Sequence, residues 1–185
     1  MKFFVAQAVS LSLLLFVIPQ VAEAGTTMRT GGKAFAPPAF ASFCAREPRL
    51  CRTGGGSKLV VLQPEKASEL QQVNRAVNAR IRERSEGADD WRVPTAYGDC
   101  EDFAILKKQE LLKRGWPASA LLLTVARYRG EGHTVLTVRT SEGDLVLDNM
   151  TNSVRDWSRT PYNYFARQSQ SNGRRWERID GARQI

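Results

Sequence analysis

Three short apolar runs, separated by glycine-containing turns, follow one another in the second half of the chain. They cover residues 120–128, 133–140 and 144–149, and each alternates apolar and polar positions or is rich in β-branched residues. Runs of this length and pattern are typical of strands that pair through short turns. They predict an antiparallel sheet, and the rest of the chain must supply the layer that covers it.

Two helical segments precede the predicted sheet. The first, over residues 65–84, repeats apolar side chains at spacings of three and four, namely Leu70, Val73, Val77 and Ile81. The second begins close to Cys100 and runs to Arg114, where Gly115 and Pro117 mark its end. Helices followed by an antiparallel sheet indicate the α+β class.

The first 24 residues have the pattern of a secretory signal peptide. Lys2 is followed by an apolar run over residues 3–21 and by Ala22-Glu23-Ala24, which fits the small-x-small cleavage pattern. The strongly apolar part, residues 9–18, is short for a membrane span of about 20 residues. We therefore predict cleavage, no membrane span in the mature chain, and a periplasmic or secreted location.

The remaining chain is long enough for one domain. Residues 25–40 are rich in Gly, Thr, Ala and Pro and are predicted to be a flexible leader, and residues 41–185 are predicted to form the domain. The net charge of +8 is spread along the sequence without a nucleic-acid-binding motif. We expect no nucleic-acid partner, and a basic surface suited to anionic polymers of the cell envelope.

The three cysteines differ in their surroundings. Cys44 and Cys51 enclose a short loop that a disulfide could close in an oxidising compartment. Cys100 is then unpaired, so it has either a chemical role or an inert buried place. It lies within Gly-Asp-Cys-Glu-Asp at the predicted start of a helix, where backbone N–H groups favour a thiolate. The flanking carboxylates oppose ionisation, so a cation is needed nearby, and we expect a thiol pKa below that of free cysteine.

The chain contains one histidine, His133, which is therefore the only imidazole available as a general base for Cys100. If residues 133–140 and 144–149 pair through the turn at 141–143, with Thr140 facing Gly143, then Val135 faces Asp148. His133 is two residues from Val135 and shares its side of the sheet. Asp148 thus lies diagonally across from His133 and can orient the imidazole.

The order Cys, His, Asp, with the cysteine on a helix, is similar to that of the papain and transglutaminase group. Further motifs resemble the bacterial transglutaminase-like cysteine proteinases over about residues 40–178. They are Asp-Asp-Trp-Arg-Val-Pro at 89–94, Gly-Asp-Cys-Glu-Asp-Phe-Ala at 98–104 with Lys107, Gly-His-Thr-Val-Leu at 132–136, and Leu-Val-Leu-Asp-Asn at 145–149.

The resemblance implies a transglutaminase-like fold, a Cys100–His133–Asp148 triad and a protein or peptide substrate in the cell envelope. A branch of the family contains periplasmic proteases that release large adhesins and need calcium, bound partly by carboxylates flanking the cysteine. Asp99 and Glu101 occupy those positions here. The segment between Trp91 and Gly98 is shorter than in that branch. Calcium is the only cofactor that the resemblance implies.

Several functions remain open at this stage. Cys100 could form a thioester that water resolves, as in a peptidase, or one that passes to an amine, as in a crosslinking transglutaminase. A peptidoglycan-peptide hydrolase could use a similar dyad. A non-catalytic calcium-dependent binding protein would use Asp99, Glu101 and Asp102 as ligands and bury Cys100 as an inert thiol. In the catalytic hypotheses, the backbone N–H of Cys100 and, by analogy, the indole of Trp91 would hold the oxyanion.

Overall fold

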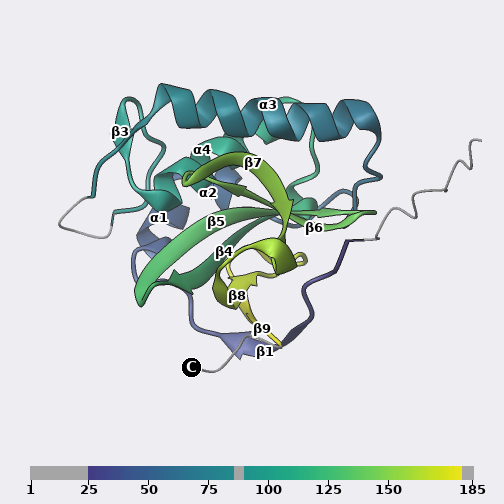
Figure 1. Cartoon of the computed structure of the whole chain (residues 1–185). Coiled ribbons are helices and arrows are strands. Elements are labelled where there is room, and N and C mark those ends of the chain that lie inside the picture. The colour runs from purple at the N-terminus through teal and green to yellow at the C-terminus, as the bar shows by residue number, and fades with distance from the viewer. Residues whose placement is uncertain (1–24, 86–89, 181–185) are drawn as a thin grey trace, which may run out of the picture.

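The computed structural model describes residues 25–85 and 90–180. The predicted signal peptide, residues 1–24, lies outside this range. One antiparallel sheet in the order β1-β9-β8-β4-β5-β6-β7 forms the body of the domain (Figure 1). Its strands are β1 (Thr30–Ala34), β4 (Leu121–Tyr128), β5 (Glu131–Thr140), β6 (Gly143–Asp148), β7 (Thr151–Asp156), β8 (Asn163–Gln168) and β9 (Trp176–Ile179).

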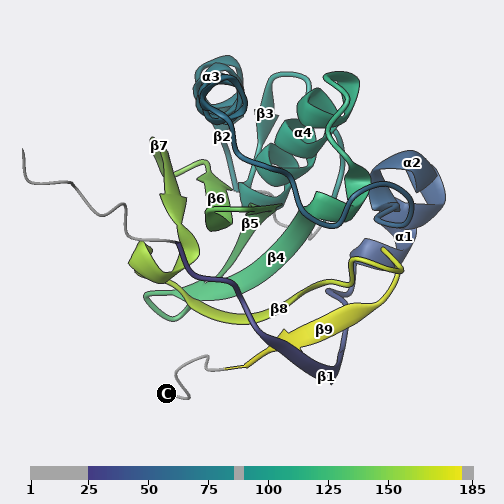
Figure 2. The same cartoon turned by 90° about the vertical axis from the view of Figure 1, so that its right-hand side faces the viewer.

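The helices gather on one face of this sheet, which Figure 2 shows with α3 seen end-on. They are α1 (Phe40–Arg46), α2 (Pro48–Cys51), α3 (Pro64–Arg80) and α4 (Cys100–Lys113), with short 3-10 turns η1 (Ala118–Ala120) and η2 (Trp157–Arg159). Helix α4 packs on β4, β5 and β6, and α3 packs on α4, β6 and β7. The predicted α+β class is confirmed.

The long helix α3 ends earlier than its apolar spacing predicts. Residues 82–83 form β2 (Arg82–Glu83), which pairs in parallel with β3 (Tyr97–Gly98) just before α4. Ile81 keeps its place in the core but has extended backbone. The apolar repeat therefore continues past the helix because the same side of the chain stays buried after the backbone changes conformation.

The hairpin register of β5 and β6 agrees with the sequence prediction. Thr140 faces Gly143, and the pairing runs back to Leu136 opposite Leu147. The next position along each strand brings Val135 towards Asp148, as expected. Because this register fixes which side chains share a face, it also fixes on which side of the sheet Asp148 and His133 lie.

The segment 25–40 is not a flexible leader throughout, contrary to the prediction from its composition. Residues 30–34 form β1, which pairs with β9 at the edge of the sheet, and Met28 is buried. The backbone N–H of Met28 donates to Asp144 Oδ2 at 2.7 Å, and Arg139 Nη2 donates to the Met28 carbonyl at 3.0 Å. A buried polar anchor thus holds a segment whose composition alone indicates a loop.

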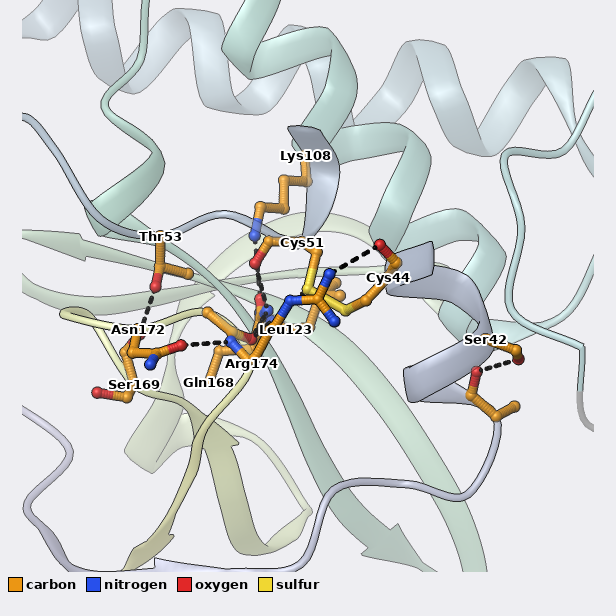
Figure 3. The surroundings of a disulfide bond; sticks show 12 residues. Ser42, Cys44, Cys51, Thr53, Lys108, Leu123, Gln168, Ser169, Asn172 and Arg174 are labelled. Carbon is orange, nitrogen blue, oxygen red and sulfur yellow. Dashed lines mark hydrogen bonds between the residues drawn. A yellow bond between two sulfur atoms is a disulfide. The ribbon is translucent and has the colours of Figure 1, made fainter. Parts of the chain in front are cut away.

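The predicted disulfide is present between Cys44 and Cys51 and joins α1 to α2 (Figure 3). Beside it, the Gln168 amide donates to the carbonyls of Cys51 and Gly173, at 3.2 and 2.8 Å. Cys100 is the free cysteine. In the described part of the chain, no helix is long and apolar enough to span a membrane.

The anchor around Asp144 generates a stability prediction. Asp144 is fully buried and accepts from Arg139 at 2.9 and 3.0 Å and from Arg167 at 3.0 Å. Asp144→Ala would leave the buried Arg167 without its counter-ion, and we expect it to lower the free energy of unfolding by about 3–5 kcal/mol. Urea unfolding followed by circular dichroism measures this loss.

Glu142→Ala is the matched control, because Glu142 lies two residues before Asp144, in the turn between β5 and β6, with its side chain exposed. Its effect should stay within about 0.5 kcal/mol. Equal losses for Asp144→Ala and Glu142→Ala would contradict the role of Asp144 as an anchor.

Candidate active site

Cys100 is the first residue of α4, and the chain before it is tightly constrained. Asp99, the N-cap residue, has extended backbone, so the chain turns sharply into the helix. A Cβ on Gly98 would lie 2.7 Å from Cβ of Asp102, closer than side-chain atoms approach. Glycine at position 98 therefore allows the first turn of α4 to fold back against β3, and this fixes the direction of the Cys100 side chain.

His133 and Asp148, predicted to meet across β5 and β6, are in contact. His133 Nε2 lies 3.0 Å from Asp148 Oδ1, and the two side chains are only 7% and 2% exposed. Tyr162 donates its hydroxyl to the other carboxylate oxygen, and the Met150 N–H donates to Oδ1 at 3.2 Å. Burial opposes ionisation of Asp148, but the hydrogen bonds from His133 and Tyr162 outweigh it and lower its pKa.

The thiol of Cys100 lies against the start of β5. The backbone N–H of Thr134 donates to Cys100 Sγ at 3.3 Å, so the sulfur is held beside the residue that follows His133. Cys100 and His133 line the same cavity of about 320 Å³. Since Asp148 engages Nε2, Nδ1 is the imidazole nitrogen available to the thiol.

The pKa of the Cys100 thiol differs from the sequence prediction. Burial, and next the carboxylate of Glu101, raise the pKa of Cys100 to about 12 instead of lowering it. The thiol donates to Glu101 Oε2 at 3.2 Å, which stabilises its protonated form. The hydrogen bond from Thr134 acts in the opposite direction but is outweighed. The helix N-terminus alone therefore does not make a thiolate here.

The acidic residues around Cys100 differ in their contacts: Glu101 contacts the thiol, whereas Asp102 contacts Arg92. Burial raises the pKa of Glu101 to about 8, and the neighbouring charge of Asp99 adds to the effect. Asp102 is fully buried and turned away: it accepts from the Arg92 N–H at 3.0 Å, and its other oxygen is 3.9 Å from Arg92 Nε. Within residues 25–85 and 90–180, no three His, Cys, Asp or Glu side chains are arranged to hold a metal ion.

Apolar side chains that the sequence did not point to form much of the cavity wall. Phe35, which is 99% exposed, precedes α1, and Phe165 belongs to β8. Trp91 also lines the cavity, and it packs edge-on against Phe40 with ring centroids 5.6 Å apart. Phe35 and Phe165 come from distant parts of the chain and no local motif marks them, whereas Trp91 lies in the Asp-Asp-Trp-Arg-Val-Pro motif.

Two asparagines of α3 hold the backbone around Asp148. Asn74 Oδ1 accepts from the Asp148 N–H at 3.1 Å, and Asn78 Nδ2 donates to the Asp148 carbonyl at 3.0 Å. Their spacing of one helical turn, on the flank of the apolar face, is the sequence signal for this contact. Tyr162, in a segment with weak sequence signals, has no comparable mark.

A cysteine at the start of a helix, packed on an antiparallel sheet that carries a histidine and a carboxylate, is the arrangement of transglutaminase-like cysteine peptidases. Residues 30–184 match the model of the bacterial transglutaminase-like cysteine proteinases. The chain belongs to this family, and it is a transglutaminase-like cysteine peptidase.

Solved structures give the same fold. The calcium-bound form of Legionella pneumophila LapG matches with a TM-score of 0.54 and 22% identity, covering 82% of this chain and 84% of that one. Another LapG structure from the same organism matches with a TM-score of 0.50 and 23% identity, covering 72% and 77%. An EGTA-treated form matches equally well, with coverage of 72% and 75%. No curated relative matches in sequence.

The position of Glu101 generates a prediction on the reactivity of the thiol. Glu101→Gln removes a charge that raises the pKa of Cys100, so a larger fraction of the thiol is ionised at a given pH. Without calcium, at about pH 9 where the wild-type Glu101 is ionised, we expect alkylation by iodoacetamide to be on the order of tenfold faster. Mass spectrometry of the labelled chain measures the rate.

Glu110→Gln is the control, because Glu110 lies on the same helix but pairs with Lys113 near its other end. Its alkylation rate should equal that of the wild type. An unchanged rate in Glu101→Gln would show that this carboxylate does not govern the thiol.

Proposed function

We propose that this chain is an exported peptidase in which Cys100, His133 and Asp148 form the catalytic triad. The observation that carries the proposal is the 3.0 Å contact of His133 Nε2 with Asp148 Oδ1. The Cys100 thiol lies next to it, because its sulfur accepts from the N–H of Thr134, which follows His133 on β5. The substrate is a protein or peptide of the cell envelope.

The proposed reaction passes through a thioester. His133 Nδ1 takes the proton of the Cys100 thiol while the sulfur attacks a peptide carbonyl, and the tetrahedral intermediate forms. Its collapse breaks the C–N bond, and the imidazolium gives its proton to the leaving amine. His133 then takes a proton from water as that water attacks the thioester, and the thiol is released. Asp148 holds the imidazole in the required tautomer and stabilises its charged form.

The developing oxyanion needs donors next to Cys100. The backbone N–H of Cys100, in the first turn of α4, is one candidate, and the positive end of the helix dipole points to the same place. Trp91 lines the cavity, so its indole is proposed as the second donor. Its packing against Phe40 keeps the ring in a fixed orientation.

Export is supported by two independent features. The first 24 residues have the pattern of a cleavable signal peptide. The Cys44–Cys51 disulfide suits an oxidising compartment such as the periplasm or the exterior. We therefore propose a periplasmic or secreted enzyme.

Asp99 and Glu101 are proposed as ligands of a calcium ion. The matched LapG structure is calcium-bound. Here burial and the charge of Asp99 hold Glu101 towards its protonated form, which is the situation of two carboxylates that lack a countercharge. Carboxylate oxygens suit this hard cation, which takes six to eight oxygen ligands, so these two residues supply part of the set. A bound calcium ion would add positive charge beside the thiol.

The triad is tested by substitution. Cys100→Ala should abolish hydrolysis, and His133→Ala should come close to the same loss because the chain has no second imidazole. Asp148→Asn should lose up to about 10⁴-fold in kcat, since it disturbs the tautomer. Combining Cys100→Ala with His133→Ala should be hardly worse than Cys100→Ala alone. Hydrolysis of peptide substrates, with circular dichroism to verify folding, provides the measurement.

Asp156→Asn is the control, because Asp156 bonds the exposed Thr26 and Ser158 and lies outside the cavity. It should keep wild-type activity. Substantial hydrolysis by Cys100→Ala would rule out the thioester mechanism.

The calcium site is tested by titration calorimetry on the metal-free protein. The wild type should release or absorb heat with a saturating isotherm, while Asp99→Ala and Glu101→Gln should bind much more weakly. Glu110→Gln should bind as the wild type does. A wild type that gives no heat above the buffer, or an Asp99→Ala variant that binds normally, would exclude these ligands.

A further inference from the structure

Lys107 is a buried amine. Its side chain is fully buried, and within residues 25–85 and 90–180 no hydrogen-bond acceptor meets its Nζ. The amine lies 5.7 Å from the centre of the Phe103 ring, a weak substitute for solvation. A charge in such a place is costly, and burial lowers the pKa of Lys107 to about 7. An unpaired buried amine of this kind requires an explanation.

The position of Lys107 on α4 relates it to the proposed triad. It follows Cys100 by seven residues, so it lies two turns along the same face of the helix. Helix α4 packs on β5 and β6, and Asp148 is the last residue of β6. The negative charge of Asp148 is the one attraction that favours the protonated form of Lys107 and so partly offsets the effect of burial on its pKa.

The groups that act on Asp148 come from several elements. His133 on β5 and Tyr162 before β8 hydrogen-bond the carboxylate, and Tyr164 on β8 is affected by its charge. Helix α3 contributes only neutral amides, which bond the backbone of Asp148. Among these described neighbours, Lys107 is the one group that can supply a countercharge while the imidazole is neutral, and it does so when its amine is protonated.

We propose that Lys107 is a positioning residue, whose ammonium group stabilises the Asp148 carboxylate from the side of α4 and keeps it paired with His133. The inference rests on the proposed function, since it assigns Lys107 a part in the triad. It explains why an amine is buried here without a hydrogen bond: its partner is the charge of Asp148. A methionine would fill the same space without the charge.

A positive charge makes neighbouring groups lose their protons more readily. Removing it therefore shifts every nearby titration to higher pH. At an effective dielectric constant of about 20, a full unit charge roughly 10 Å away shifts a neighbouring pKa by on the order of 1 pH unit, and a partly protonated amine shifts it by less. A lysine that only fills space would cause no such shift.

The neighbouring Lys108 supplies a matched control. It is equally buried, and burial lowers its pKa to about 7 as well, with no contribution from Asp148. Its Nζ donates to Gln168 Oε1 at 3.0 Å, next to the disulfide (Figure 3). Lys108→Met thus removes a buried amine of the same helix without changing the charge near Asp148.

The experiment uses the fact that the chain has one histidine. In untagged protein carrying Cys100→Ala, a single imidazole signal can be followed by NMR as the pH changes. We expect Lys107→Met to raise its midpoint by about 0.5–1 pH unit and Lys108→Met to leave it in place. Lys107→Arg, which keeps a positive charge throughout the titration, should not raise the midpoint. Lys107→Gln serves as the neutral variant if Lys107→Met does not fold.

The inference is wrong if the midpoint is the same in Lys107→Met and the parent, or if Lys108→Met moves it equally. Because this titration needs no turnover, it tests Lys107 even where peptide hydrolysis, and with it the proposed function, fails. In active protein, Lys107→Met should also lower kcat with little change in KM and move both limbs of the pH profile upwards.

Discussion

The packing of α4 across β5 is the constraint on which the candidate site depends. It brings the N-terminus of the helix to the start of the strand, so the Cys100 sulfur meets the N–H of Thr134 beside His133. The β5–β6 register then brings Asp148 to the same side of the sheet. Three side chains from three elements converge because one helix crosses one hairpin. The α3 asparagines strengthen this arrangement by holding the backbone of Asp148 from the other side.

The surroundings shift the pKa values of Asp148 and Cys100 in opposite directions. At one end, hydrogen bonds from His133 and Tyr162 lower the pKa of Asp148, which favours its carboxylate. At the other end, burial and Glu101 favour a protonated thiol. The resting arrangement therefore favours an ionised Asp148 beside His133 and a neutral Cys100 thiol. A change in charge near Glu101 would alter the thiol without disturbing the hydrogen bonds of Asp148.

The sequence predicted the parts of the site that depend on local rules. Glycine-containing turns and alternating residues located β4, β5 and β6, and the turn between the last two fixed the register that brings His133 to Asp148. Spacing likewise identified the Cys44–Cys51 disulfide. The resemblance to the family also pointed to the Asp99 and Glu101 carboxylates beside Cys100. That they bind calcium stays a prediction.

Long-range contacts escaped this reasoning for a physical reason. Strand β1 was missed because its glycines disfavour a strand, while its stability comes from β9 and from Asp144, more than a hundred residues away. Tyr162 and Phe165 belong to a segment without clear periodicity. The thiol pKa was predicted in the wrong direction, because burial of Cys100 depends on packing that no short motif records.

The pairing of β1 with β9 also bears on when the domain can fold. Thr30 lies opposite Ile179, so the first strand has its partner near the far end of the chain. A polypeptide that emerges N-terminus first, from a ribosome or from a translocation channel, cannot close this edge of the sheet until almost all of it has emerged. Closure of so long a loop is slow relative to the local hairpins. The order of strands thus delays completion of the native sheet until almost the whole chain has emerged.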